Sequence, residues 1–176
     1  PPNHWGSHFT PSVWEYDPPT DEYYLHLFAK EQPDLNWENP EVRQQVWKIM
    51  RFWLDKGVDG FRMDVINLIK KPEGLPDSPL PATCAEGYAF DCDLYANNPG
   101  LTDFYREMKR EVLDHYPVMT VGETAKVTPK FALDYVGEPE RLLSMVFHFQ
   151  IVELRDNFTW GGFKAIQRKW VDALWH

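Results

Sequence analysis

Residues 39–66 read NPEVRQQVWKIMRFWLDKGVDGFRMDVI, a pattern that predicts a helix followed directly by a strand. Asn39 is a typical N-cap, and Pro40 suits the first helical position because an N–H there would have no partner. An apolar stripe at helical spacing follows, made of Val42, Val46, Ile49 and Trp53. Gly57 is typical of the residue that ends a helix. The β-branched and aromatic residues at 58–66 then predict a short strand.

The same alternation of helices and short apolar strands continues along the sequence. Further helices are predicted near 101–115, 128–136 and 163–175, and further strands at 118–123 and 143–149. This order favours parallel strands joined by helical crossovers, which is an α/β architecture. Three such strands are too few for a closed (β/α)8 barrel, which needs eight strands in about 250 residues. We therefore expect a central segment of a larger barrel, with residues 67–98 as a loop.

Residues 1–36 have a different character, because they are rich in aromatic and turn-forming residues. A turn is predicted at 17–21, where two prolines follow an aspartate. A strand of mainly aromatic and apolar residues is predicted directly after it, at 22–28.

The chain is acidic, with 18 Lys and Arg residues against 27 Asp and Glu residues and a formal net charge of −9. An acidic chain repels phosphate backbones, so nucleic acid is not an expected partner, and an anionic membrane surface is disfavoured for the same reason. No apolar run approaches the roughly 20 residues of a membrane-spanning helix. Aromatic residues make up 15% of the chain, which is compatible with stacking on sugars, although the core is the commoner place for any single ring.

The sequence contains two cysteines, Cys84 and Cys92, both in the predicted loop. Two are too few for a disulfide framework, and they lack the close pairing of a zinc site. We expect two free thiols in the reducing cytoplasm, and the alternative is one local disulfide that closes the loop.

Two of the predicted strands end in a carboxylate, Asp64 and Glu123. In a parallel barrel, residues at the carboxyl ends of the strands face the active site. Neighbouring strands lie about 4.8 Å apart, so the two carboxylates can approach the roughly 5–5.5 Å that a retaining glycosidase requires. In such an enzyme one carboxylate attacks the anomeric carbon, while the other protonates the departing oxygen and then activates water. The alternative is that either acid is only a helix N-cap.

Arg62 lies two residues before Asp64 and therefore points to the same face of the strand. A guanidinium beside a carboxylate favours its charged form, which suits a nucleophile. The alternative is a structural ion pair within the barrel.

Three segments together carry a resemblance to a known family: residues 60–67 (GFRMDVIN), 120–123 (TVGE) and 32–36 (QPDLN). They resemble, in the expected order, the nucleophile strand of the α-amylase superfamily of glycoside hydrolases, its acid/base strand, and the motif that ends the small domain inserted after its third strand. Three shorter segments resemble the oligo-1,6-glucosidase branch of that superfamily, namely residues 5–7 (WGS), 14–16 (WEY) and 145–149 (MVFHF).

The resemblance implies a retaining α-glucosidase with Asp64 as nucleophile, Glu123 as general acid/base and Arg62 as the partner of the nucleophile. It implies that residues 37–176 form about strands four to six of the (β/α)8 barrel, and that residues 1–36 end the inserted antiparallel subdomain. The family's motifs on the third and seventh strands would lie outside the chain, as would its calcium loop where present. We therefore expect that the remainder of the barrel is required, and that the chemistry needs no metal or organic cofactor.

The resemblance also suggests the substrate, an oligosaccharide with terminal α-linked glucose. Val65, directly after the nucleophile, resembles the members that act on α-1,6 linkages, although Val also simply suits a strand. Phe147 and His148 are expected to line the sugar pocket or to belong to the core. Thr124 and Gln150 depart from the Met and Glu of many relatives, which affects fine specificity.

The sequence is also compatible with three alternative functions. Trehalose-6-phosphate hydrolase shares the strand motifs but needs a phosphate site, and residues 1–36 contain no obvious basic cluster. Sucrose isomerisation or transglucosylation uses the same carboxylates. A non-catalytic relative, such as a transporter heavy chain, would keep the barrel and lose the acids, and the presence of Asp64, Glu123 and Arg62 argues against it.

Overall fold

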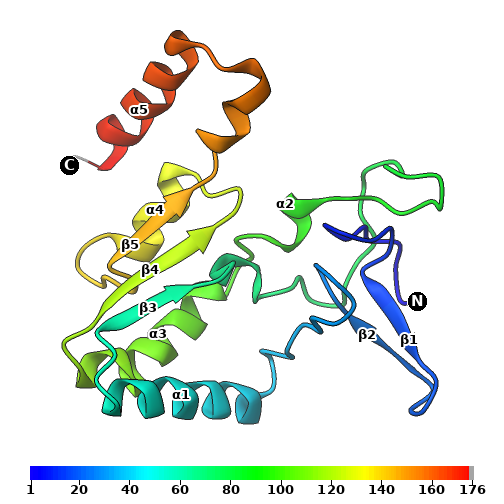
Figure 1. Ribbon diagram of the computed structural model, residues 1–176, viewed down its shortest axis with the longest axis horizontal. Helices are drawn as coiled ribbons and strands as arrows, with labels where there is room; N and C mark the ends of the chain where they lie inside the picture. The colour runs from blue at the N-terminus through cyan, green and yellow to red at the C-terminus, as the bar shows by residue number, and fades with distance from the viewer. Residues whose placement is uncertain (175–176) are drawn as a thin grey trace.

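The computed structural model describes residues 1–174 of the chain, and Figure 1 shows its two separate sheets. β1 (Trp14–Asp17) and β2 (Glu22–Leu25) form an antiparallel hairpin near the N-terminus. β3 (Gly60–Met63), β4 (Met119–Thr124) and β5 (Met145–His148) form a parallel sheet in the order β3-β4-β5. This sheet confirms the α/β architecture that the sequence predicted.

Within residues 1–174, five α-helices and three short 3-10 helices connect and cover the strands. The α-helices are α1 (Pro40–Asp55), α2 (Cys92–Tyr95), α3 (Leu101–Glu111), α4 (Pro129–Val136) and α5 (Trp160–Leu174). The 3-10 helices are η1 (Ile66–Leu68), η2 (Leu113–His115) and η3 (Val152–Asn157). Among residues 1–174, no helix is both long and apolar enough to cross a membrane.

The start of α1 follows the sequence signals, but its buried face does not. The Asn39 side chain accepts a hydrogen bond from the N–H of Glu41 at 2.9 Å, as an N-cap does. The buried residues of the helix are Trp47, Met50 and Leu54. The predicted stripe is therefore not the core face, since Ile49 is 58% exposed and Trp53 48% exposed. The helix carries apolar residues on two adjacent faces, and periodicity alone does not decide which of them meets the sheet.

The main core lies between one face of the parallel sheet and the helices. It joins Trp47 of α1, Tyr105 and Met108 of α3, Tyr135 of α4 and Trp170 of α5. Alternate strand residues point to the other face of the sheet, where the side chains of Met119, Met145 and Phe147 are exposed.

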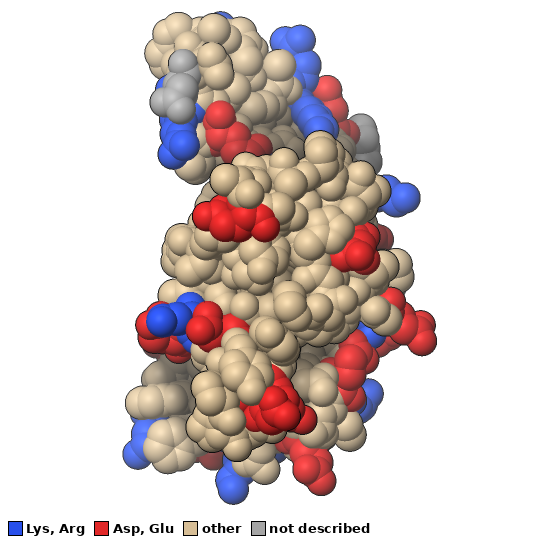
Figure 2. Space-filling view, turned by 90° about the vertical axis from the view of Figure 1, so that its right-hand side faces the viewer, with Lys and Arg blue, Asp and Glu red and all other residues tan. Residues whose placement is uncertain are grey.

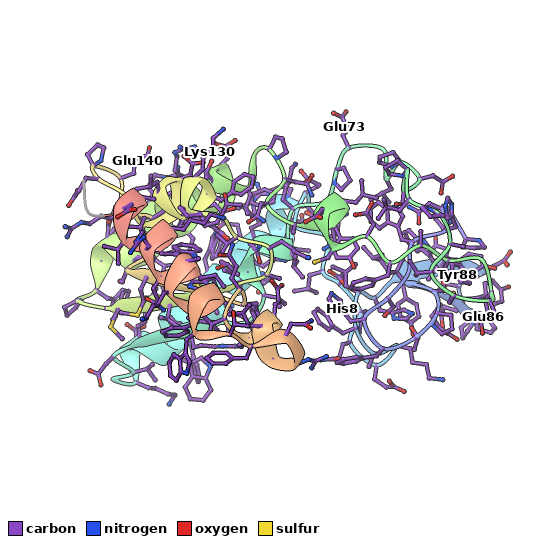
Figure 3. All side chains as sticks on the ribbon, turned by 90° about the horizontal axis from the view of Figure 1, so that it is seen from above. His8, Glu73, Glu86, Tyr88, Lys130 and Glu140 are labelled. Carbon is purple, nitrogen blue, oxygen red and sulfur yellow. The ribbon has the colours of Figure 1, made fainter. Side chains whose placement is uncertain are left out.

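A second core cluster supports the N-terminal part of the chain. Its fully buried members include Trp5, Val13, Leu27 and Tyr95, with Cys92 beside them. Figure 1 shows the β1–β2 hairpin at the opposite end of the molecule from α5. Figure 3 shows Glu86 and Tyr88 at the hairpin end and His8 nearer the middle of the molecule. The division of the chain into residues 1–36 and 37–176 stays a prediction.

Several element boundaries differ from those that the sequence suggested. The strand expected at 58–66 ends at Met63, because the backbone of Val65 is left-handed and η1 begins at the next residue. The helix expected at 101–115 ends at Glu111 and continues as η2. The last helix begins at Trp160, and its expected end at Trp175 lies outside the described residues.

Cys84 and Cys92 are both free, as expected, and no local disulfide closes the loop between them. Cys92 is buried against the second core cluster. Burial raises the pKa of its thiol to about 11. The Cys92 side chain is therefore a neutral, apolar packing group at physiological pH.

Candidate active site

The parallel register brings Asp64 and Glu123 to neighbouring strand ends, as expected. Met63 pairs with Gly122, so each carboxylate comes one residue after a paired position. Gly60 makes this close register feasible, because a Cβ there would lie 1.9 Å from the carbonyl oxygen of Met119.

One guanidinium group joins the two carboxylates. Nη1 of Arg62 donates a hydrogen bond to Oδ1 of Asp64, and Nη2 of Arg62 lies 2.5 Å from Oε2 of Glu123. The hydrogen bond to Asp64 and the charge of Glu123 raise the pKa of Arg62, so this residue stays a cation. The structure thus brings together the three residues that the sequence singled out first.

The two carboxylates differ in their surroundings. The side chain of Asp64 is 74% exposed, whereas that of Glu123 is 14% exposed. Oε2 of Glu123 also accepts a hydrogen bond from the backbone N–H of Val65 at 3.1 Å. An accessible carboxylate and a sheltered one, joined by a common cation, form an arrangement suited to two different roles on one substrate.

Val65 occupies an unusual backbone conformation directly after Asp64. Its φ of 35° and ψ of 40° lie in the left-handed region, which is strained for a β-branched residue. Such strain persists only where surrounding contacts fix it, and it is concentrated at functional sites. Its side chain is partly buried against the second core cluster.

Phe147 and His148 end β5 but point in different directions. Phe147 pairs with Glu123 in the register, is 41% exposed, and lies with its ring centroid 5.6 Å from the guanidinium carbon of Arg62. His148 instead stacks on Trp170 of α5, with ring centroids 4.3 Å apart and planes 8° apart. Burial lowers the pKa of His148. The structure therefore places Phe147 beside the carboxylate group and His148 on the helix side of the sheet.

Sequence reasoning missed two asparagines that support these strand ends, Asn67 and Asn97. The side chain of Asn67 is fully buried and hydrogen-bonded to Asn97 and to the carbonyl of Ala125. The available signal was a polar residue inside the otherwise apolar run 65–69, where a buried amide requires partners.

A pocket of about 750 Å³ lies between the β1–β2 hairpin, residues 34–38 and residues 69–75. Glu73, labelled in Figure 3, is part of its lining. Its two lysines are both paired with carboxylates, since Lys70 lies 2.5 Å from Glu38 and Lys71 lies 2.7 Å from Asp34. None of the residues lining this pocket belongs to the group of Arg62, Asp64 and Glu123.

Acidic side chains are spread over the face shown in Figure 2, the face at the hairpin end of the molecule. This distribution matches the net charge of −9. Among residues 1–174, no group of three or more His, Cys, Asp or Glu side chains has the arrangement of a metal site.

Comparison with known proteins identifies relatives along almost the whole chain. The family model for the alpha amylase catalytic domain matches residues 1–173. The oligo-1,6-glucosidase of Parageobacillus thermoglucosidasius is 55% identical over 153 residues, which is 87% of this chain and 27% of that protein. The alpha-glucosidase of Pediococcus pentosaceus is 50% identical over 96% of this chain and 29% of that protein. The chain thus spans less than a third of the length of these two relatives.

Solved structures show the same fold. Trehalose-6-phosphate hydrolase of Bacillus licheniformis, as a mutant in complex with a ligand, matches with a TM-score of 0.90 at 36% identity, over 99% of this chain and 32% of that chain. Isomaltulose synthase of Erwinia rhapontici matches with a TM-score of 0.83 at 34% identity, over 98% of this chain and 32% of that chain. The parallel sheet and its helices are therefore part of the (β/α)8 barrel that the sequence predicted.

Proposed function

The chain belongs to the alpha-amylase catalytic-domain family, and from this we propose that the protein containing it is a retaining α-glucosidase. The observation that carries the proposal is the contact of one guanidinium, that of Arg62, with both Asp64 and Glu123 at adjacent strand ends. A retaining glycosidase needs two carboxylates close together with different roles, and a cation between them fixes their relative positions.

In the proposed mechanism Asp64 attacks the anomeric carbon of the terminal glucose. The bond to the departing oxygen breaks as that oxygen takes a proton from Glu123, and a glycosyl ester on Asp64 results. Glu123, now a carboxylate, removes a proton from water, which attacks the same carbon and releases glucose and free Asp64. The exposure of Asp64 and the shelter of Glu123 support this division of roles.

Arg62 and Phe147 are proposed to support the bound sugar from the same side. The guanidinium orients Asp64 and remains charged through both steps. The exposed Phe147 ring beside it offers an apolar surface on which a sugar ring can stack. His148 acts from the other side of the sheet by packing β5 against Trp170.

We propose terminal α-1,6-linked glucose as the preferred substrate, with α-1,4-linked glucose as a second one. The names of the oligo-1,6-glucosidase relatives, at 55% and 53% identity, support this preference, and so does Val65 directly after Asp64.

Trehalose-6-phosphate hydrolase is the second candidate, because a structure of one such enzyme matches with a TM-score of 0.90. Its sequence identity of 36% is lower than the 55% shared with the oligo-1,6-glucosidase. The paired state of Lys70 and Lys71 also disfavours phosphate recognition in the pocket that they line. Sucrose isomerisation uses the same carboxylates, and product analysis distinguishes it.

The wider setting of the enzyme is also a proposal. Residues 1–36 would end the inserted subdomain and residues 37–176 would form the centre of the barrel, which needs its remaining strands to act. Carboxylates and water suffice for the chemistry, so no cofactor is proposed. A role in carbohydrate metabolism in the cytoplasm is proposed because both thiols are free, as reducing conditions keep them.

Covalent trapping tests the proposal most directly. The full-length protein would be treated with a fluorinated glucosyl fluoride, which forms the glycosyl ester but hydrolyses slowly, and then digested for mass spectrometry. We expect the label on Asp64 and no label on the Asp64→Asn variant, whose amide cannot form the ester. A label on another carboxylate would show that the nucleophile is misassigned.

A further inference from the structure

Asn67 ties together the two chain segments that follow the paired carboxylates. It lies in η1, three residues after Asp64, and its side chain is 0% exposed. Its Nδ2 donates hydrogen bonds to the carbonyl oxygen of Ala125 at 2.6 Å and to Oδ1 of Asn97 at 2.9 Å. Ala125 follows the end of β4, two residues after Glu123. One buried amide therefore connects the turn after Asp64 to the end of the strand that carries Glu123.

A second asparagine and a tyrosine hold this amide in place. The backbone N–H of Asn97 donates to the carbonyl oxygen of Asn67 at 3.0 Å. The hydroxyl of Tyr135, a buried residue of α4, donates to Oδ1 of Asn97 at 2.8 Å. Within residues 1–174 Oδ1 of Asn67 has no partner, so the side chain acts here only as a donor.

The turn that Asn67 fixes is the strained one at Val65. The N–H of Leu68 donates to the carbonyl oxygen of Val65 at 2.9 Å and closes the turn. The N–H of Val65 then points across the strands to Oε2 of Glu123, at 3.1 Å. A β-branched residue leaves the left-handed region unless its neighbours are fixed on both sides. The hydrogen bonds of Asn67 fix the C-terminal side of this turn.

We propose that Asn67 is a positioning residue that acts through Val65 to orient the carboxyl group of Glu123. The inference rests on the proposed function, in which Glu123 donates the proton to the departing oxygen. When the donors of Asn67 are lost, the turn relaxes and the N–H of Val65 moves away from Glu123. The carboxyl group then keeps its contact with Arg62 but loses the second of the two contacts that direct Oε2, so proton donation becomes the affected step.

The test uses Asn67→Asp in the full-length protein. This change keeps the volume of the side chain, removes both donors and sets a carboxylate against two oxygens. The kcat/KM for isomaltose, which needs proton donation, would be compared with that for dinitrophenyl α-glucoside, which does not. We expect a loss of about 100-fold for isomaltose and less than about 10-fold for the aryl glucoside, since general acid catalysis contributes about 10²–10⁴-fold.

If Asn67 had only a structural role, Asn67→Asp would lower kcat/KM for both substrates equally. Asn98→Asp serves as the matched control. Nδ2 of Asn98 also donates to two carbonyl oxygens, those of Lys70 and Leu94, each at 3.1 Å, and neither belongs to a carboxylate-bearing strand end. We expect this control to lower the Tm and to leave the ratio of the two kcat/KM values unchanged.

Tyr135→Phe is the milder variant of the same network, and it keeps the test decisive if Asn67→Asp does not fold. It removes the hydroxyl that holds Asn97, so the ratio should shift in the same direction by a smaller factor. The inference would be overturned if every folded variant of Asn67 and Tyr135 kept the wild-type ratio of kcat/KM for isomaltose to kcat/KM for the aryl glucoside.

Glu123→Gln, measured in parallel, separates this inference from the proposed function. If Glu123→Gln loses isomaltose activity selectively while the network variants do not, the positioning role is wrong and the proposed function stands. If Glu123→Gln affects both substrates equally, Glu123 is not the acid and the proposed function itself is wrong.

Discussion

Nη2 of Arg62 lies 2.5 Å from Oε2 of Glu123, across the boundary between β3 and β4. The same guanidinium contacts Asp64, so two acids on separate strands share a single cation. Charge-assisted hydrogen bonds of this kind are both stronger and more directional than neutral ones.

Glu123→Gln should slow the cleavage of poor leaving groups far more than that of good ones. An amide cannot donate the proton that an alkoxide leaving group needs, whereas an activated phenolate leaves without it. We expect a loss of about 10²–10⁴-fold for alkyl glucosides in kcat/KM, which reports the first chemical step. External azide should restore the second step by attacking the glycosyl ester in place of activated water.

Val65→Ala should change the linkage preference of the full-length enzyme. We expect the native protein to favour isomaltose over maltose in kcat/KM, and the smaller side chain to raise the relative rate on maltose. Steady-state rates for both disaccharides check this. A native enzyme that cleaves maltose faster, or one that prefers phosphorylated trehalose, would contradict the proposed specificity.

Gly60→Ala should strongly destabilise the parallel sheet that positions Asp64 and Glu123. A Cβ at position 60 would lie 1.9 Å from the carbonyl oxygen of Met119, so β3 and β4 would have to separate. The free energy of unfolding should fall by more than about 3 kcal/mol, as buried steric conflicts do. Gly161→Ala is the control, because a Cβ there meets only the Thr159 hydroxyl at 4.0 Å, and it should be neutral or stabilising by up to about 1 kcal/mol. Denaturant titration of both variants measures the difference.

The stability of the protein should depend on pH through His148. Burial lowers the pKa of His148 in the folded state, nearby Glu153 opposes the shift and Lys169 reinforces it. The unfolded state therefore binds a proton first as the pH falls. The contribution of neutral His148 to the free energy of unfolding is therefore complete above about pH 6.5. It is lost as the pH falls from there toward the lower pKa that His148 has in the folded state.

His148→Gln should flatten this dependence, even though it also removes the ring stacked on Trp170. The measurement is the slope of Tm against pH between about pH 8 and pH 5. The absolute Tm is not compared, because it also reflects the loss of the stacked ring. His115→Gln is the matched control substitution, because the side chain of His115 is exposed. Equal slopes for the native protein and His148→Gln would rule out this histidine as a source of the pH dependence.

Residues 1–176 expressed alone should be inactive and poorly packed. One face of the parallel sheet exposes Met119, Met145 and Phe147, and apolar side chains on a parallel sheet are normally buried on both faces. We expect no hydrolysis of nitrophenyl α-glucoside and a weak near-UV circular dichroism spectrum. Cooperative unfolding together with turnover that Asp64→Asn abolishes would show that this stretch folds and acts by itself.

The sequence by itself determined the α/β order and the identity of the paired acids. Strand-like runs before Asp64 and Glu123, with helical runs between them, indicate that both acids lie at one edge of the sheet, because parallel strands with helical crossovers align their carboxyl ends. Their selection as a catalytic pair also rested on the resemblance of residues 60–67 and 120–123 to a known family. The period of two in a strand also placed Arg62 on the same face as Asp64. Local patterns carry this information because strand and helix geometry repeat at fixed intervals.

Only the tertiary structure decided which faces are buried and how the strand ends are held. Trp47, Met50 and Leu54 form the inner face of α1 because the sheet and α3 lie on that side, which no period within the helix specifies. The alternation of side-chain directions along β3 does not continue to Val65, where contacts from other segments hold the backbone in the left-handed region. Asn67 and Ala125 are 58 residues apart in the sequence, and their hydrogen bond exists only once β3 and β4 have paired.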